Sequence, residues 1–158
     1  MSMKIIVQKF GGTSVKDEGS RQHAKKHIKK ALADGYKVVV VVSAMGRKGD
    51  PYATDTLLSL IGGNHSKVSK REHDLLLSCG EIISSVVFAN MLQDDGINAI
   101  ALTGAQAGFR TNNDYSQAKI IEMKCDRLLR KLEDKDVVVV AGYQGAAKTG
   151  DITTIEIG

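Results

Sequence analysis

The sequence predicts a three-layer α/β/α sandwich built around one mainly parallel β-sheet. Its 158 residues suit a single domain, and its hydrophobic share of 42% is that of a chain able to bury a full core. Two apolar runs, residues 38–42 and 137–141, show no polar alternation, which is typical of central strands covered on both faces. Strand and helix patterns alternate along the chain, and this alternation favours parallel strands joined by crossover helices.

The first βαβ unit is expected near the amino terminus. A β-branched run at residues 5–7 predicts a buried strand, and residues 38–42 form the next one. The helix between them is capped by Asp17 or Ser20 and ends at Gly35. The crossover is expected to be right-handed, and because the two strands are parallel their carboxyl ends open at the same edge of the sheet, where ligands bind.

The rest of the chain continues this alternation. A Ser-x-x-Glu pattern at residues 69–72 fits a capping box and opens a long helix to about residue 92. Cys79 and Cys125 are interpreted as core residues. The other expected elements are a short helix from Thr54 or Asp55 through residue 60, strands at residues 97–102 and 119–123, a helix at residues 125–133 and a strand at residues 137–141.

Gly80 and Glu81 interrupt the apolar face of the long helix. Glycine in a helix costs about 1 kcal/mol relative to alanine, and a carboxylate is rarely buried without a partner. Two interpretations remain open. Either Gly80 permits close packing while Glu81 points to solvent, or Glu81 faces the sheet edge and binds an ammonium group or a lysine.

A loop at residues 9–15 is the first candidate binding site. Lys9 is followed by two glycines and two hydroxyl residues, directly after the first strand. Glycines let backbone N–H groups approach an anion and a lysine supplies positive charge, so phosphate is the expected ligand. An ordinary strand-to-helix turn with a snorkelling lysine is the alternative. Small-residue loops at residues 43–46 and 103–109 follow other strands at the same edge, which favours convergence on one ligand.

Composition and motifs exclude several classes of function. The formal charge of +4 comes from scattered residues of both signs, and the three phenylalanines and four tyrosines form no basic-aromatic stripe, so no nucleic-acid partner is expected. His23 and His27 lie on a predicted helix face among lysines that would repel a metal ion, so no metal site is predicted. The sequence has neither a P-loop nor a Gly-x-Gly-x-x-Gly pattern.

The expected cellular setting is the cytoplasm, without a membrane. The two cysteines have no Cys-x-x-Cys partner, and the amino terminus lacks the apolar core and cleavage site of a signal peptide. No apolar stretch approaches the roughly 20 residues that a membrane span requires.

Five glycine- and hydroxyl-rich segments recur near the ends of the expected elements. They are Lys-Phe-Gly-Gly-Thr-Ser-Val at residues 9–15, Val-Ser-Ala-Met-Gly at residues 42–46, Ser-Cys-Gly-Glu at residues 78–81, Gly-Tyr-Gln-Gly at residues 142–145 and Gly-Asp-Ile-Thr-Thr at residues 150–154. Together they resemble the ordered motif set of the aspartokinases of Bacillus-type bacteria, within the amino acid kinase superfamily. The resemblance covers essentially the whole chain and implies the amino acid kinase-like fold.

The resemblance implies transfer of a phosphoryl group from ATP, with Mg²⁺, to the β-carboxylate of L-aspartate. The product is 4-phospho-L-aspartate, the first intermediate towards lysine, threonine and methionine. Lys9 would be the catalytic residue and would neutralise charge on the transferring group. The residues implied to contact phosphate and ATP are Lys9, Phe10, Gly11, Gly12 and Ser43. The residues implied to hold aspartate are Thr13, Ser14, Thr54 and Glu81, with Glu81 on the α-ammonium group.

The resemblance stops at the carboxyl end. In the family, the segment that corresponds to residues 150–154 continues into a Gly-Arg-Gly-Gly-Ser-Asp motif, a nucleotide-binding half and ACT regulatory domains. Here residues 156–158 read Glu-Ile-Gly and the sequence ends. We therefore expect residues 1–158 to be the amino-acid-binding, C-terminally truncated part of an aspartokinase catalytic domain. A cut sheet leaves an unpaired edge, through which copies would associate.

Two functions follow from these expectations. In the first, the chain keeps the phosphate and aspartate loops of an aspartokinase but has little or no activity alone, because charged partners in phosphoryl transfer lie outside it. In the second, it is a non-catalytic module that binds an anion or an amino acid, or a subunit completed by another chain.

Overall fold

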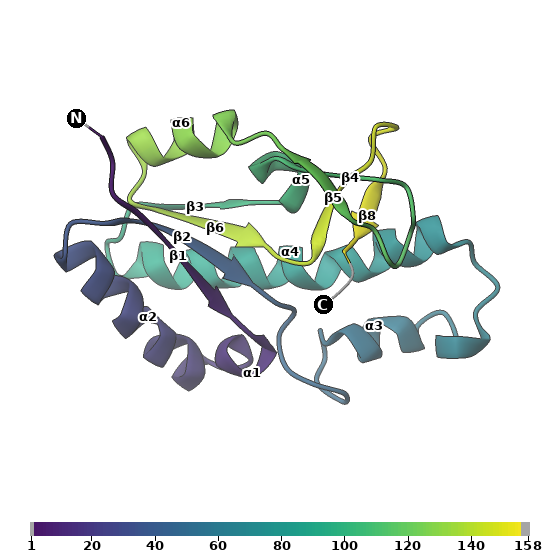
Figure 1. Cartoon of the computed structure of the whole chain (residues 1–158). Helices are drawn as coiled ribbons and strands as arrows, with labels where there is room; N and C mark the ends of the chain where they lie inside the picture. Colours follow the sequence, from purple (N-terminus) through teal and green to yellow (C-terminus); the bar gives the residue numbers. More distant parts are fainter. Residues whose placement is uncertain (1, 156–158) are drawn as a thin grey trace.

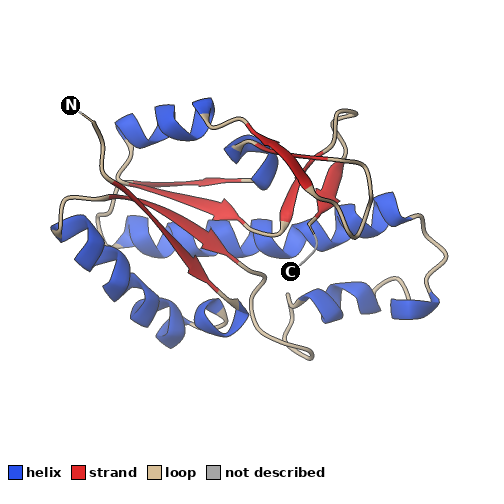
Figure 2. Cartoon of the chain, viewed as in Figure 1, coloured by secondary structure: helices blue, strands red, loops and turns tan. Residues whose placement is uncertain are grey.

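The computed structural model describes residues 2–155, which build two β-sheets flanked by helices (Figure 1 and Figure 2). All three pairings in the larger sheet, sheet A, are parallel, as the sequence predicted. Its strands, in spatial order, are β1 (Ile5–Phe10), β2 (Lys37–Val42), β6 (Val137–Ala141) and β3 (Ala99–Leu102). Residues 156–158, where the sequence departs from the aspartokinase pattern, lie outside the described residues.

Helices cover both faces of sheet A and confirm the three-layer arrangement (Figure 1). Val40 of β2 lies in the core on one face, and its neighbour Val39 lies in the core on the other. The helices of the first face are α2 (Glu18–Ala33) and α4 (Lys70–Asp94), and those of the second are α5 (Gly104–Ala107) and α6 (Asp126–Asp134). The continuous valine runs of β2 and β6 are therefore explained by burial on both sides.

β1 is exposed on one face, so the prediction of a buried strand is wrong. It is the outermost described strand of sheet A, and Val7 is 64% exposed. Ile6 and Phe10 pack into the core beneath α2 and α4. Among the described residues, the core beneath α5 and α6 contains side chains of β2, β3 and β6 but none of β1. The β-branched run thus identified a strand without showing how many helices cover it.

Two predicted loops contain short helices instead. β1 extends through Phe10, and α1 (Gly12–Val15) begins two residues later. α5 begins at N-cap Thr103, whose side chain forms a reciprocal capping box with Gln106. Gly108, with a φ of +111°, ends α5 in the left-handed conformation that glycine favours. The glycines that predicted open loops therefore lie at the beginning or the end of short helices.

A second sheet, sheet B, was not predicted. β4 pairs antiparallel with β5 and parallel with β7, and β7 pairs antiparallel with β8. Of its four strands the sequence predicted only β5, and it assigned β5 to a single sheet. The other three strands have three residues each, which is too short to show an alternating pattern. The strands of sheet B, in spatial order, are β5 (Ile120–Met123), β4 (Phe109–Thr111), β7 (Gln144–Ala146) and β8 (Ile152–Thr154).

α4 is a 25-residue helix that contacts both sheets. Its N-cap Ser69 accepts a hydrogen bond from the Glu72 backbone N–H, at the predicted helix start. Cys79 is exposed on α4 and Cys125 is half-buried, so the core prediction is wrong for Cys79. By length and composition α4 could cross a membrane, although the sequence analysis expected no apolar stretch of that length. Half of the apolar segment of α4 is buried within the fold. It is preceded by α3 (Thr54–Ser59) and a 3₁₀ turn, η1 (Gly63–His65).

Asp74 joins α4 to sheet B from a fully buried position. Its Oδ2 accepts hydrogen bonds from the backbone N–H groups of Ser116 and Thr154, both at 2.8 Å. Its Oδ1 accepts from the hydroxyl groups of the same two residues, at 3.4 and 2.8 Å. Ser116 has a φ of +74°, an uncommon conformation for a serine, so this side chain also fixes the strained segment before β5.

We predict that Asp74→Leu lowers the free energy of unfolding by about 2–5 kcal/mol, because two buried backbone N–H groups lose their acceptor. Asp74→Asn keeps an oxygen for those N–H groups, and the two hydroxyl groups can turn to accept from its amide, so it should cost about 1 kcal/mol. Urea unfolding followed by circular dichroism measures both. Equal losses from the two variants would contradict the assigned hydrogen bonds.

Candidate functional site

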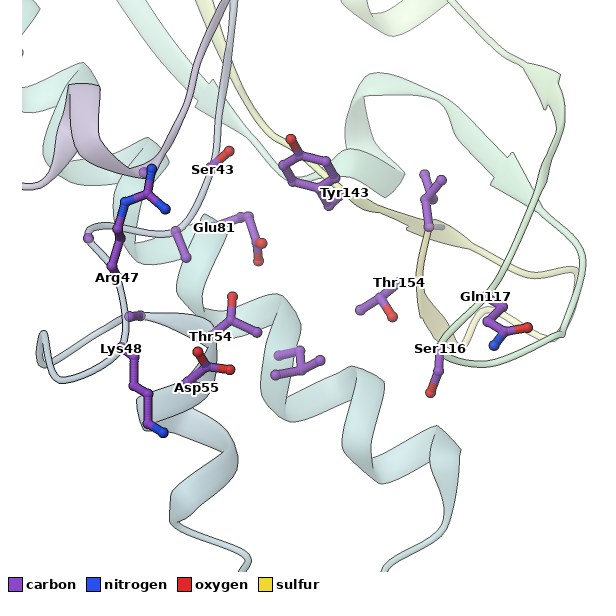
Figure 3. Close-up of a pocket in the computed structure, with 16 residues that line it drawn as sticks. Ser43, Arg47, Lys48, Thr54, Asp55, Glu81, Ser116, Gln117, Tyr143 and Thr154 are labelled. Carbon is purple, nitrogen blue, oxygen red and sulfur yellow. The ribbon is translucent and has the colours of Figure 1, made fainter. Parts of the chain in front are cut away.

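A pocket of about 520 Å³ opens where β2 and β6 end, between α3, α4 and sheet B (Figure 3). Arg47 and Lys48 come from the loop on one side of it. Ser116 and Gln117 come from the segment before β5 on the other side. The pocket therefore lies at the carboxyl edge of the parallel sheet, where ligands were expected.

Glu81 is the buried acidic group of this pocket. Its side chain belongs to α4, points into the pocket and is 8% exposed (Figure 3). Burial raises the pKa of the Glu81 carboxyl to about 7, because an apolar environment disfavours the charged form. Within residues 2–155, no basic side chain forms an ion pair with it. A cationic group of a ligand could therefore supply the missing charge.

Gly80 explains how Glu81 reaches the sheet edge. A Cβ at this position would lie 3.0 Å from the Ala44 side chain and 3.3 Å from the Tyr52 backbone oxygen. α4 therefore packs closely against the loop that follows β2, and the next residue, Glu81, turns into the pocket. Both parts of the open question are answered: Gly80 has a packing role, and Glu81 does not point to solvent.

The loops after β1 and β2 meet in this pocket, as the sequence predicted, but the loop at residues 103–109 does not line it. The Gly46 backbone N–H donates to the Gly12 carbonyl oxygen at 3.0 Å, and a Cβ on Gly12 would lie only 2.6 Å from the Gly46 oxygen. The Asp50 carboxyl accepts from the Arg47 backbone N–H at 2.8 Å and holds the second loop in a turn. The close backbone contact between Gly12 and Gly46 leaves no space for a side chain at Gly12.

The predicted site residues fall into three groups. Gly12, Ser43, Thr54 and Glu81 line the pocket together. Lys9 does not line it, but its Nζ lies 4.4 Å from the ring centroid of Tyr143, which does. Phe10, Thr13 and Ser14 line a different hollow, between α1 and α2, and Gly11 lines neither.

Sequence reasoning missed several residues of the pocket wall. Tyr143 belongs to the Gly-Tyr-Gln-Gly motif, but the sequence analysis assigned it no function. The glycine before it, which permits close backbone contact, could have indicated its position in the site. Ser116, Gln117 and Thr154 reach the pocket through the Asp74 hydrogen bonds, which join residues 42 and 80 positions apart. No local pattern could indicate contacts over that distance.

A family model described as the amino acid kinase family matches residues 4–157. The chain belongs to this family. Aspartokinase 1 of Bacillus subtilis (strain 168) is 68% identical over 153 residues, which make up 97% of this chain and 38% of that protein. The aspartokinase of Geobacillus stearothermophilus is 43% identical over 97% of this chain and 36% of that protein. The chain therefore spans less than two fifths of the length of these curated relatives.

Solved structures place the fold in the same family. The aspartate kinase of Synechocystis superposes with a TM-score of 0.76 and 38% identity, over 98% of this chain and 24% of that chain. Escherichia coli aspartokinase III, in complex with aspartate and ADP, gives a TM-score of 0.72 over 98% of this chain and 44% of that chain. Its identity of 21% supports the fold alone. The expected amino acid kinase-like fold is confirmed.

We predict that Glu81→Gln stabilises the protein at pH 8 and has little effect near pH 4. Because the folded-state pKa is raised from 4.5 to about 7, the folded wild type binds more protons than the unfolded chain in this range and loses stability as the pH rises. At 1.36 kcal/mol per pH unit, the loss above pH 7 is about 3 kcal/mol. Glutamine avoids this cost, and unfolding experiments from pH 4 to pH 8 measure the difference.

Glu72→Gln is the matched control for this prediction. Glu72 lies on the same helix, but it is exposed, and hydrogen bonds from Ser69 and Arg71 lower its pKa. It should therefore give no stabilisation as the pH rises. A Glu81→Gln effect that stays constant with pH would contradict a raised pKa for Glu81.

Proposed function

We propose that the chain provides the aspartate- and phosphate-binding part of an aspartokinase. The reaction is transfer of a phosphoryl group from ATP to the β-carboxylate of L-aspartate, which gives 4-phospho-L-aspartate. The observation that carries this proposal is the buried Glu81, which has no ion-pair partner among residues 2–155, in a pocket whose rim bears Arg47 and Lys48. An acidic floor and a basic rim suit an amino acid with a second carboxylate, and relatives named aspartokinases support the choice.

Glu81 is the proposed partner of the α-ammonium group of aspartate. An ammonium ion in contact with the carboxyl favours its charged form and lowers its pKa, so the ligand recovers the burial cost of this group. The Thr54 hydroxyl, at the start of α3, lines the same pocket and is the proposed second contact. In this arrangement the side-chain carboxylate of aspartate extends towards the sheet edge and the basic rim.

Lys9, Gly12 and Ser43 are the proposed phosphate contacts. Phosphoryl transfer needs mainly positioning and stabilisation of negative charge, which a lysine, a hydroxyl group and close-packed backbone can provide. Mg²⁺ commonly binds through substrate phosphates and water with one or two carboxylates, so it needs no dedicated cage of acidic residues. Contacts of Phe10, Gly11, Thr13 and Ser14 with ligands stay predictions.

The second candidate function is a non-catalytic binding module or a subunit completed by another chain. The exposed apolar residues of β1, Ile5 and Val7, offer a surface for such association. Both cysteines are free, which fits the proposed cytoplasmic setting.

We predict that L-aspartate binds to the wild-type chain and at least about ten-fold more weakly to Glu81→Gln, because loss of a charge-assisted hydrogen bond costs about 1.5–3 kcal/mol. Calorimetric titration measures both affinities, and Glu72→Gln is the control. Succinate lacks the ammonium group, so its binding should not depend on Glu81. Equal aspartate affinity in wild type and Glu81→Gln would contradict the proposed role.

Turnover separates both candidate functions from a chain that is fully active alone. An assay that traps aspartyl phosphate as the hydroxamate, with ATP, Mg²⁺ and aspartate, should give little or no product with this chain alone. Aspartate binding without turnover is the expected combination. Robust turnover would show that the chain needs no further catalytic groups, and absence of aspartate binding would overturn both the kinase part and an amino-acid-binding module.

A further inference from the structure

Two side chains from opposite sides of β2 meet above its carboxyl end. Lys9 belongs to β1 and Tyr143 follows β6, and β2 lies between these strands in sheet A. The Nζ atom of Lys9 lies 4.4 Å from the centroid of the Tyr143 ring, within the range of a cation–π interaction. Ser43, the first residue after β2, lines the pocket together with Tyr143 (Figure 3).

The backbone of Tyr143 is in an unusual conformation that the surrounding structure imposes. Its φ of +57° lies in the left-handed region, which residues other than glycine, asparagine and aspartate seldom adopt. The Tyr143 carbonyl oxygen accepts from the Ile155 N–H at 2.9 Å. The next residue, Gln144, is buried and bonds to Gly104 and Ser78. Strain held on both sides in this way often marks a functional position.

Gly142 allows the chain to cross β2 closely enough for this contact. Its N–H donates to the Val42 carbonyl oxygen at 2.9 Å. A Cβ at Gly142 would lie 2.9 Å from that same oxygen and 3.1 Å from the Val41 side chain. The tyrosine that follows is therefore carried over the end of β2 towards β1 and Lys9.

The Tyr143 hydroxyl group takes part in the same cluster. The neighbouring Lys9 side chain, and to a smaller extent the Ser43 hydroxyl group, lower the pKa of the Tyr143 phenol. This direction agrees with the position of the ammonium group at the ring face.

We propose that Tyr143 is a positioning residue that holds the Lys9 ammonium group over the end of β2, ready to meet phosphate. This inference rests on the phosphate-binding role given to Lys9 above. The Lys9 side chain is long, and it lies on the face of β1 that no described helix covers. A fixed aromatic partner reduces the conformational freedom that phosphate binding would otherwise have to remove.

A neutral partner suits this role better than an acidic one. Within residues 2–155, no carboxylate forms an ion pair with Lys9. A carboxylate would orient the ammonium group but also cancel its charge and compete with the phosphate. An aromatic ring with a hydroxyl group orients the ammonium and leaves its full positive charge available.

The first experiment tests the contact itself, independently of any ligand. Tyrosine ring carbons labelled with ¹³C are titrated by NMR, and the Tyr143 signal is identified with Tyr143→Phe. We expect Lys9→Met to raise the Tyr143 pKa, because the positive neighbour is lost. Lys4→Met, which removes an exposed lysine just before β1, should leave it unchanged. An unchanged Tyr143 pKa in Lys9→Met would overturn the inference.

The second experiment tests the role, with inorganic tripolyphosphate and Mg²⁺ as the probe. Tyr143→Leu should weaken its binding by about three- to ten-fold, as loss of a cation–π contact predicts. Tyr143→Phe keeps the ring and should give a smaller loss, and Lys9→Met should give the largest loss. NMR titration measures these affinities, and thermal unfolding checks that each variant is folded.

The outcomes separate this inference from the proposed function. If Lys9→Met binds tripolyphosphate as tightly as wild type, the phosphate role of Lys9 fails, and the positioning role fails with it. If Lys9→Met binds weakly but Tyr143→Leu and Tyr143→Phe bind like wild type, only the positioning role of Tyr143 is overturned. Should Tyr143→Leu not fold, Tyr143→Met, which also lacks the ring, replaces it in this comparison.

Discussion

The buried carboxyl group of Asp74 is the interaction on which the site depends. It accepts four hydrogen bonds from Ser116 and Thr154 and fastens sheet B to α4. α4 also packs on sheet A, so one helix fixes the distance between the two sheets. The pocket lies beside this connection, between α3, α4 and sheet B. Without the Asp74 hydrogen bonds, the wall that carries Ser116 and Gln117 would be held less firmly relative to Glu81.

The electrostatics of the pocket arise from the same arrangement. α4 buries Glu81 without a basic partner among the described residues and so raises the pKa of its carboxyl to about 7. Two cations, Arg47 and Lys48, remain at the exposed rim, and Lys9 is held by an aromatic ring beyond it. Burying an unpaired acid lowers stability, and such a cost is typical of positions kept for a ligand.

Patterns longer than about five residues predicted the fold well. The valine runs of β2 and β6 predicted buried strands, and the caps of α2 and α4 predicted where these helices begin, because burial on both faces and capping leave local patterns. The strands β4, β7 and β8 left none, because each has only three residues. The face of β1 was misjudged, since a β-branched run does not reveal what covers it.

The sequence by itself determined the family motifs, the parallel sheet and the edge at which Gly12 and Ser43 would meet. The tertiary structure alone decided that Glu81 is buried, that Thr13 and Ser14 line a different hollow, and that Tyr143 crosses β2 to reach Lys9. The physical reason is how far apart in the sequence the residues that decide each property lie. Strand periodicity, caps and glycine turns depend on neighbours in the chain, whereas burial, pKa and side-chain contact depend on residues that only the folded chain brings together.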